Sequence, residues 1–332
     1  MRVTALAGGI GGARFLRGLR AALPDAEITV IGNTGDDIWV HGLRVCPDLD
    51  TVMYTLGGGI SAERGWGRED ETFQVKEELA AYGVEPTWFG LGDKDTATHL
   101  LRTQALHTGF SLSAVTEALC ARWQPGVRLL PMTDDRAETH VVVDDPSGER
   151  DDTGAPLQVA LHFQEWWIRY RAQLPAHAFT VIGIDEAAPA PGVIEAIGGA
   201  DLIVLPPSNP VVSIGTILQV PGIADAVRTA SAPVVGLSPI IGGAPVRGMA
   251  DACLTALGIE TSAAAVAAHY GARGSGGLLD AWLVDTADAD AVAGIEALGI
   301  RCRAVPLLMT DLDATTAMAS AAIDLAAEIA RR

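Results

Sequence analysis

The chain has 332 residues, of which 49% are hydrophobic and 19% are charged, and its formal net charge at pH 7 is −18. This composition is typical of a soluble α/β protein, and we expect a cytoplasmic protein without a signal peptide or a membrane-spanning segment. The charge argues against a nucleic-acid partner, because phosphate backbones are bound by clustered Lys and Arg. A phosphorylated small molecule remains compatible with it, because local backbone amides and a few cations can hold such a ligand.

The first 32 residues predict a β-α-β unit. Residues 3–7 form a buried apolar strand, residues 13–23 an amphipathic helix, and residues 27–32 a second strand. Such a unit belongs to a parallel sheet covered by helices. We therefore predict a single α/β domain over residues 1–332, with a Rossmann-like, mostly parallel sheet, helices on both faces and a mostly helical insertion around residues 65–123.

The glycines between the first strand and the helix form a candidate phosphate-binding loop: Gly8, Gly9, Gly11 and Gly12. Glycine lets the backbone approach a phosphate closely, and a helix N-terminus offers free N–H groups. The spacing differs from GxGxxG and no GKS or GKT is present, so this is not a Walker P-loop. A tight turn between strand and helix is the alternative interpretation.

An acidic segment follows the second strand and contains four aspartates: Asp36, Asp37, Asp48 and Asp50. Asn33 and Thr34 directly precede them and could bind a polar ligand. Carboxylates in such apolar surroundings need a compensating cation. The pattern therefore favours a divalent metal site, and Asn/Asp turns or helix caps are the alternative.

Polar loops after later strands extend the predicted site. In open α/β sheets, ligands bind beyond the carboxyl ends of the strands. The loops after the strands at 202–205 and 233–237 suit a nucleotide base, ribose or phosphate, with the candidate residues Ser208, Asn209, Ser213, Ser238, Gly242 and Gly243. The segment GLGDKDTATH (90–99) places Lys94, which could meet a phosphate, before a helix that carries His99 and Arg102.

The chain resembles the 2-phospho-L-lactate transferase family of coenzyme F-420 biosynthesis in segments that occur in this order: AGGIGGARFLRGL, NTGDDIWVHGLRVCPDLDTVMYTLGG, GLGDKDTATHLLR, LLPMTDD, HFQEWW, PPSNPVVSIG and LSPIIGGAPVRG. LLMTDLDAT near the C-terminus also fits. GLRVCPDLDTVMYTLGGGI and GWG (65–67) are most similar to the actinobacterial branch, in which the transferred acid is thought to be phosphoenolpyruvate.

The resemblance implies a Mg²⁺-dependent transferase and a homodimer. Its donor is guanosine diphosphate joined to phosphoenolpyruvate or 2-phospho-L-lactate, and its acceptor is the deazaflavin Fo, whose terminal hydroxyl displaces GMP. The second aspartate of PDLD lies at acceptor and metal in this family, so Asp50 is the first candidate. Asp36 shares the metal, Asp37 and Asp48 assist, and one of the four carboxylates could take the hydroxyl proton.

The resemblance also implies which parts of the donor each loop binds. The glycines and the Ser208–Asn209 loop hold the diphosphate and guanosine, assisted by the loop from Ser238 to Gly243. Trp66 or Trp88 could stack on the flat acceptor ring, and a core role for each tryptophan is the alternative. Some relatives have a basic residue where this chain has Gly90, which leaves the contribution of Lys94 or Arg102 open.

Two other functions belong to different classes. A related branch of the same fold contains non-catalytic nucleotide-sugar-binding regulators, but such a regulator needs no metal-binding PDLD segment to activate an alcohol. A Rossmann-type dehydrogenase has different loop spacing and an acidic residue where this chain has Asn33 and Thr34. Neither GxSxG nor HExxH occurs, so covalent hydrolysis and zinc chemistry are not favoured. The sequence leaves the identity of the three-carbon acid undecided.

Overall fold

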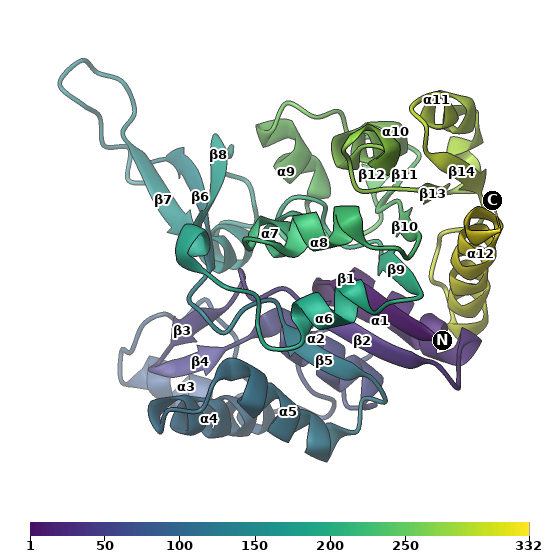
Figure 1. The fold of residues 1–332 in the computed structure, drawn as a ribbon. Helices are drawn as coiled ribbons and strands as arrows, with labels where there is room; N and C mark the ends of the chain where they lie inside the picture. Colours follow the sequence, from purple (N-terminus) through teal and green to yellow (C-terminus); the bar gives the residue numbers. More distant parts are fainter. Residues whose placement is uncertain (332) are drawn as a thin grey trace.

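The centre of the molecule is a parallel sheet. In the computed structural model, which describes residues 1–331, seven strands pair in the order β14-β13-β10-β9-β1-β2-β5, and all neighbouring pairs are parallel (Figure 1). The strands are β1 (Arg2–Ala7), β2 (Glu27–Gly32), β5 (Arg128–Pro131), β9 (Leu202–Leu205), β10 (Val234–Leu237), β13 (Ala281–Val284) and β14 (Arg301–Ala304). The predicted Rossmann-like sheet is confirmed.

Helices cover both faces of this sheet, as predicted. Val30 and Ile31 belong to different cores, because successive side chains of a strand point to opposite sides. The core that contains Val30 is covered by α1 (Gly9–Ala22), α2 (Pro47–Leu56), α5 (Leu112–Trp123) and α12 (Leu312–Ala330). The core that contains Ile31 is covered by α6 (Val193–Gly198), α7 (Ile214–Gln219), α8 (Ile223–Thr229), α9 (Ala250–Ala256), α10 (Ala263–Tyr270) and α11 (Val292–Ala297).

The helix after β1 begins earlier than predicted. It starts at Gly9, whose left-handed φ of +63° marks the turn from the strand, so Gly11 and Gly12 lie in its first turn. A Cβ at Gly12 would lie 2.6 Å from the Oγ of Ser208. The missing side chains let this turn pack closely on the loop after β9. This tertiary contact, and not helix propensity, decides where α1 begins.

The segment predicted as a helical insertion is mostly helical, and its last helix packs on the central sheet. Residues 65–123 contain α3 (Gln74–Ala81), α4 (Asp93–His107) and α5. The hairpin of β3 (Ile38–Val40) and β4 (Leu43–Val45) packs beside α4. This packing brings the start of α4 towards the acidic segment that follows β2.

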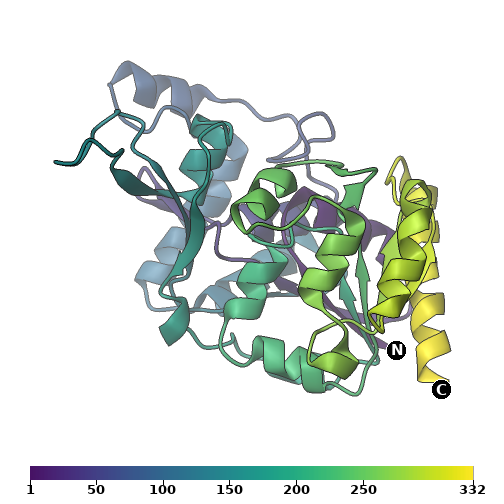
Figure 2. The same ribbon diagram turned by 90° about the horizontal axis from the view of Figure 1, so that it is seen from above.

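A small antiparallel sheet, which the sequence analysis did not predict, has the order β7-β6-β8. It consists of β6 (Glu138–Asp144), β7 (Gln158–His162) and β8 (Ala178–Ile182). The β6–β7 connection projects from the body of the molecule (Figure 1). The view from above shows this teal hairpin on the side opposite the yellow C-terminal helix (Figure 2).

Short elements complete the described chain. They are the strands β11 (Ile240–Ile241) and β12 (Ala244–Pro245) and the short helical segments η1 (Glu165–Arg169), η2 (Ile184–Glu186), η3 (Arg273–Ser275) and η4 (Thr286–Ala291). Within residues 1–331, none of the helices has both the length and the apolar character that crossing a membrane requires.

Candidate functional site

The predicted phosphate-binding glycines lie at the carboxyl end of β1. The backbone N–H of Gly8 donates to the Oγ of Ser208 at 3.2 Å, and this hydroxyl donates to the carbonyl oxygen of Gly8 at 2.8 Å. A Cβ at Gly8 would lie 2.6 Å from Asp48 Oδ2 and 2.7 Å from the Cβ of Ser213. The sheet extends in opposite directions from β1 and β9. These residues therefore meet at a topological switch point, where α/β sheets bind ligands.

Asp36 and Asp48 form a buried carboxylate pair beside these glycines. The Nδ2 of Asn33 donates to Asp48 Oδ2 at 2.9 Å, whereas Oδ1 of Asp36 has no partner among residues 1–331. Burial raises the pKa of Asp36 well above its usual value, and the nearby charge of Asp48 raises it further. Burial also raises the pKa of Asp48 to about 6, against the hydrogen bond from Asn33. A divalent cation would relieve the cost of both charges.

Asp37 has a different partner. Its carboxylate accepts a hydrogen bond from the Nη2 of Arg44 at 3.0 Å, and Arg44 also lies 3.7 Å from Glu138. Burial raises the pKa of Asp37 to about 6, although the charge of Arg44 acts to lower it. Arg44 pairs with one oxygen of Asp37, whereas Oδ1 of Asp37 has no partner among residues 1–331, and the charge of Asp37 acts to raise the pKa values of Asp36 and Asp48. Its predicted assistance to the metal stays a prediction.

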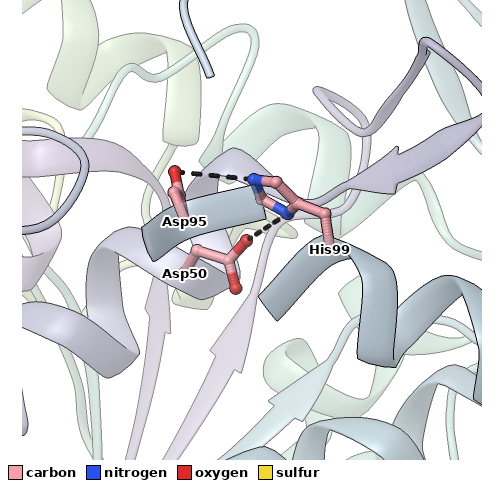
Figure 3. A group of neighbouring side chains, drawn as sticks. All are labelled: Asp50, Asp95 and His99. Carbon is pink, nitrogen blue, oxygen red and sulfur yellow. Dashed lines mark ion pairs between the residues drawn. The ribbon is translucent and has the colours of Figure 1, made fainter. Parts of the chain in front are cut away.

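Asp50 belongs to a second buried cluster, formed by α2 and α4 (Figure 3). Arg102 donates from Nη2 to Asp50 Oδ1. His99 lies between two carboxylates, with Nδ1 3.7 Å from Asp50 Oδ2 and Nε2 3.5 Å from Asp95 Oδ2. The hydroxyl of Tyr54 donates to Asp95 Oδ1 at 2.7 Å. Only one oxygen of Asp50, Oδ2, is without a hydrogen-bond partner in the described chain.

The contact between Arg102 and His99 determines which imidazole nitrogen carries the proton. The Nη1 of Arg102 lies 3.1 Å from Nδ1 of His99. A guanidinium can only donate, so Nδ1 accepts and the proton is on Nε2, facing Asp95. Although burial acts to raise it, the pKa of Asp95 is held below its usual value by His99 and by the Tyr54 hydroxyl.

This tautomer bears on metal binding. Asp50, Asp95 and His99 offer ligand atoms within 4.8 Å of one another, the spacing of a candidate metal site. In the arrangement above, Nδ1 of His99 accepts from Arg102, whereas Nε2 has no hydrogen-bond partner among residues 1–331. The predicted role of Asp50 as a metal ligand stays a prediction.

Two of the predicted loop residues form hydrogen bonds within their own loops. Oδ1 of Asn209 accepts hydrogen bonds from the N–H groups of Val211 and Val212, at 2.9 and 3.2 Å. The hydroxyl of Ser238 donates to the carbonyl of Ile240 at 2.8 Å. The predicted residues Thr34, Gly242 and Gly243 lie on the loops after β2 and β10, and Thr34 is buried with no partner for its hydroxyl within residues 1–331. Their ligand contacts stay predictions.

The predicted residues within the segment 65–123 differ in their exposure to solvent. The Nζ of Lys94 donates to the carbonyl of Glu69 at 3.0 Å, so this cation is turned towards the 61–71 loop. Trp66 is 43% exposed. Trp88 is partly buried, and its ring contacts Phe89 edge-on. Trp66 is thus the freer of the two rings proposed for stacking.

Sequence reasoning left the contribution of Arg102 open and assigned no role to Asp95 or His99. The i,i+4 spacing of Asp95 and His99 on one helix could have indicated that they meet. Their contact with Asp50, 45 or more residues earlier, carries no such local signal. A cavity of about 740 Å³ near the C-terminal end of α1 is lined by none of the predicted site residues.

Comparison with known proteins identifies the family. The model of the family described as 2-phospho-L-lactate transferase CofD matches residues 3–301. Proteins named phosphoenolpyruvate transferase from Streptomyces griseus and Thermobifida fusca are 68% and 64% identical, over 99% and 100% of both chains. The one from Mycolicibacterium smegmatis is 58% identical over 98% of this chain and 99% of its own.

A solved structure shows the same fold at low sequence identity. The crystal structure of protein BH3568 from Bacillus halodurans superposes with a TM-score of 0.61 at 18% identity, over 97% of this chain and 99% of that one. The family match over most of the chain and the high identity of the full-length relatives agree with the residues gathered at the switch point. This chain belongs to the 2-phospho-L-lactate transferase family.

Proposed function

We propose that this protein transfers a phosphoenolpyruvate or 2-phospho-L-lactate moiety from its guanosine-diphosphate-activated donor to the terminal hydroxyl of the deazaflavin Fo, and that GMP is released. The name shared by relatives with 56–68% identity favours phosphoenolpyruvate as the transferred acid. The observation that carries the proposal is the buried Asp36–Asp48 pair beside Gly8, because phosphoryl transfer needs compensated charge next to a phosphate cradle. A homodimer and a cytoplasmic location stay predictions.

The residues beside the glycines fit a Mg²⁺ ion. Asp36 has a buried oxygen without a partner in residues 1–331, and burial raises the pKa values of both Asp36 and Asp48. These two carboxylates would hold the ion, an all-oxygen ligand set of the kind that Mg²⁺ prefers. When bound, Mg²⁺ neutralises charge on the diphosphate and on the departing GMP.

Asp50 is assigned to the acceptor. Arg102 binds Oδ1 of Asp50 and holds the carboxylate in one orientation, while Oδ2 remains available to accept a hydrogen bond from the Fo hydroxyl. The hydroxyl oxygen forms the new bond to phosphorus, the phosphorus–oxygen bond to GMP breaks, and the proton passes to Asp50. Burial raises the pKa of Asp50, which makes it a better proton acceptor than an exposed carboxylate.

The reaction itself is the first test. Purified protein is incubated with Fo and Mg²⁺ and with the guanylylated form of either phosphoenolpyruvate or 2-phospholactate, and the products are identified by mass spectrometry. We expect metal-dependent transfer and release of GMP, with the phosphoenolpyruvate donor preferred. Tight nucleotide binding without transfer from either donor would refute the proposal and favour the non-catalytic regulator.

Mg²⁺ binding should weaken as the pH falls. The pKa of Asp48 is raised to about 6 and that of Asp36 is also raised, so protons compete with the ion. We expect affinity about tenfold lower at pH 5.5 than at pH 7.5, measured by isothermal titration calorimetry. Asp225→Asn, at an exposed position of α8, is the control and should show the same pH dependence as the wild type. An affinity independent of pH would contradict the assignment of these ligands.

The same pKa values determine whether the free energy of unfolding rises or falls as the pH changes. A carboxyl whose pKa is raised in the folded state binds its proton more tightly than in the unfolded chain. Its contribution is therefore favourable at low pH and is lost as the pH rises from about 4 through about 6 for Asp48. Without Mg²⁺ this contribution falls between pH 5 and 7.5, and saturating Mg²⁺ should offset the loss.

A further inference from the structure

Two arginines from different parts of the chain meet beside the first turn of α1. Nη1 of Arg247 lies 2.6 Å from the position that a Cβ on Gly65 would take, and Cδ1 of Ile10 lies 3.7 Å from the same position. Arg247 therefore lies over Gly65 and next to Ile10. Arg14 follows Ile10 by four residues and shares its face of the helix.

No anionic residue compensates these two side chains. Within residues 1–331, neither Arg14 nor Arg247 forms an ion pair or a side-chain hydrogen bond with another residue, unlike Arg44 and Arg102. Burial lowers the pKa of Arg14, and the positive charge of Arg247 lowers it further. The chain has 41 acidic residues against 23 Lys and Arg, so acidic partners were abundant. Arg247 is exposed and Arg14 is partly buried, and two adjacent guanidinium groups without acidic partners attract anions from outside the chain.

The position of this pair relates it to one part of the donor. Ile10 stands two residues after Gly8, which adjoins Asp48, and Gly65 stands next to Trp66. Because Ile10 belongs to the same turn as Gly9, the pair lies near the glycines that would hold the diphosphate. The transferred three-carbon acid must lie next to that diphosphate, because its phosphorus is bonded to the donor before the reaction.

We propose that Arg14 and Arg247 bind the carboxylate of the three-carbon acid in the activated donor. This inference rests on the proposed function. The carboxylate needs a cation of its own, because the nearby aspartates repel it and the proposed metal serves the diphosphate. A guanidinium matches a carboxylate in shape and donates two parallel hydrogen bonds to it. The pair would then distinguish the activated acid from GDP, which has no carboxylate.

The test compares two ligands that differ in this group. For Arg247→Met and Arg14→Met, we expect KM for the guanylylated phosphoenolpyruvate to rise about ten- to a hundredfold, the loss of one charge-assisted interaction. The Kd for GDP should change less than about twofold in the same variants, which also shows that they fold. Arg228→Met, at an exposed position of α8, is the control and should change neither value.

Each other outcome overturns a different claim. An equal loss of affinity for GDP would show that the arginines bind the diphosphate, and unchanged KM would show that they bind neither group.

Arg247→Lys should recover only part of the effect, because an ammonium keeps the charge but loses the paired hydrogen bonds. If the wild type transfers nothing, the proposed function fails. The carboxylate claim is then tested by direct binding alone. It holds if the wild type binds guanylylated phosphoenolpyruvate more tightly than GDP and Arg247→Met abolishes this difference, and it fails otherwise.

Discussion

Replacement of Asp50 by asparagine should lower kcat for transfer to Fo by about a thousandfold. The amide keeps the shape of the side chain but cannot take the hydroxyl proton from the acceptor, and general-base catalysis typically contributes 10²- to 10⁴-fold. The change also removes the charge that pairs with Arg102 in the interior. The measurement is single-turnover transfer from the guanylylated donor at saturating Mg²⁺.

Binding measurements separate this effect from loss of the site. The variant should bind GDP and Mg²⁺ as the wild type does, because Asp36 and Asp48 lie in the other carboxylate group. Asp225→Asn serves again as the matched control, since Asp225 is exposed on α8. If kcat of Asp50→Asn stays within tenfold of wild type, Asp50 is not the proton acceptor. If Mg²⁺ affinity is lost instead, Asp50 is a metal ligand, as the family resemblance also allows.

Replacement of Arg102 by methionine should lower the free energy of unfolding by about 3–5 kcal/mol, the usual cost of leaving one partner of a buried ion pair uncompensated. The side chain of Arg102 is 1% exposed and that of Asp50 7% exposed, so solvent cannot replace the lost charge. Denaturant unfolding at pH 7.5 measures the loss. Arg228→Met, which breaks an exposed pair with Asp225, should leave the midpoint nearly unchanged.

Two further measurements tie this loss to Asp50. In the double variant Asp50→Leu/Arg102→Met, most of the stability should return, because an apolar pair replaces the ion pair without leaving a buried charge. The deficit of Arg102→Met should also shrink between pH 7.5 and 5. Without Arg102, the pKa of Asp50 rises further, and the carboxyl then becomes neutral at a higher pH. A deficit that is unchanged by both tests would mean that Arg102 stabilises the fold through contacts other than Asp50.

The central sheet and the site's place on it were predictable because their signals are local. Short apolar runs such as residues 27–32 end in polar loops, which indicates buried parallel strands followed by ligand-binding loops. The antiparallel sheet was not predicted, although β6 alternates in burial from Val141 to Val143. Its partner strand β7 has no fully buried side chain and therefore lacks a clear apolar pattern.

The composition of the acidic segment predicted a charged centre, but it did not predict which neighbours each carboxylate contacts. Asp48 and Asp50 are two residues apart on α2, and the helix turns them towards different neighbours. Asp48 contacts Asn33 and the start of α1, whereas Asp50 contacts α4. A count of carboxylates in the sequence could not show that Asp48 and Asp50 belong to different clusters.

The sequence by itself determined the family, the parallel sheet and the strand ends at which the site lies, because these depend on residue patterns within short segments. Only the tertiary structure decided which charges are paired. Arg44 compensates Asp37, Arg102 compensates Asp50, and the Asp36–Asp48 pair has no cation among residues 1–331. Ion pairs depend on distances of a few ångströms between segments far apart in the chain, and the packing of α4 and the first turn of α1 sets those distances.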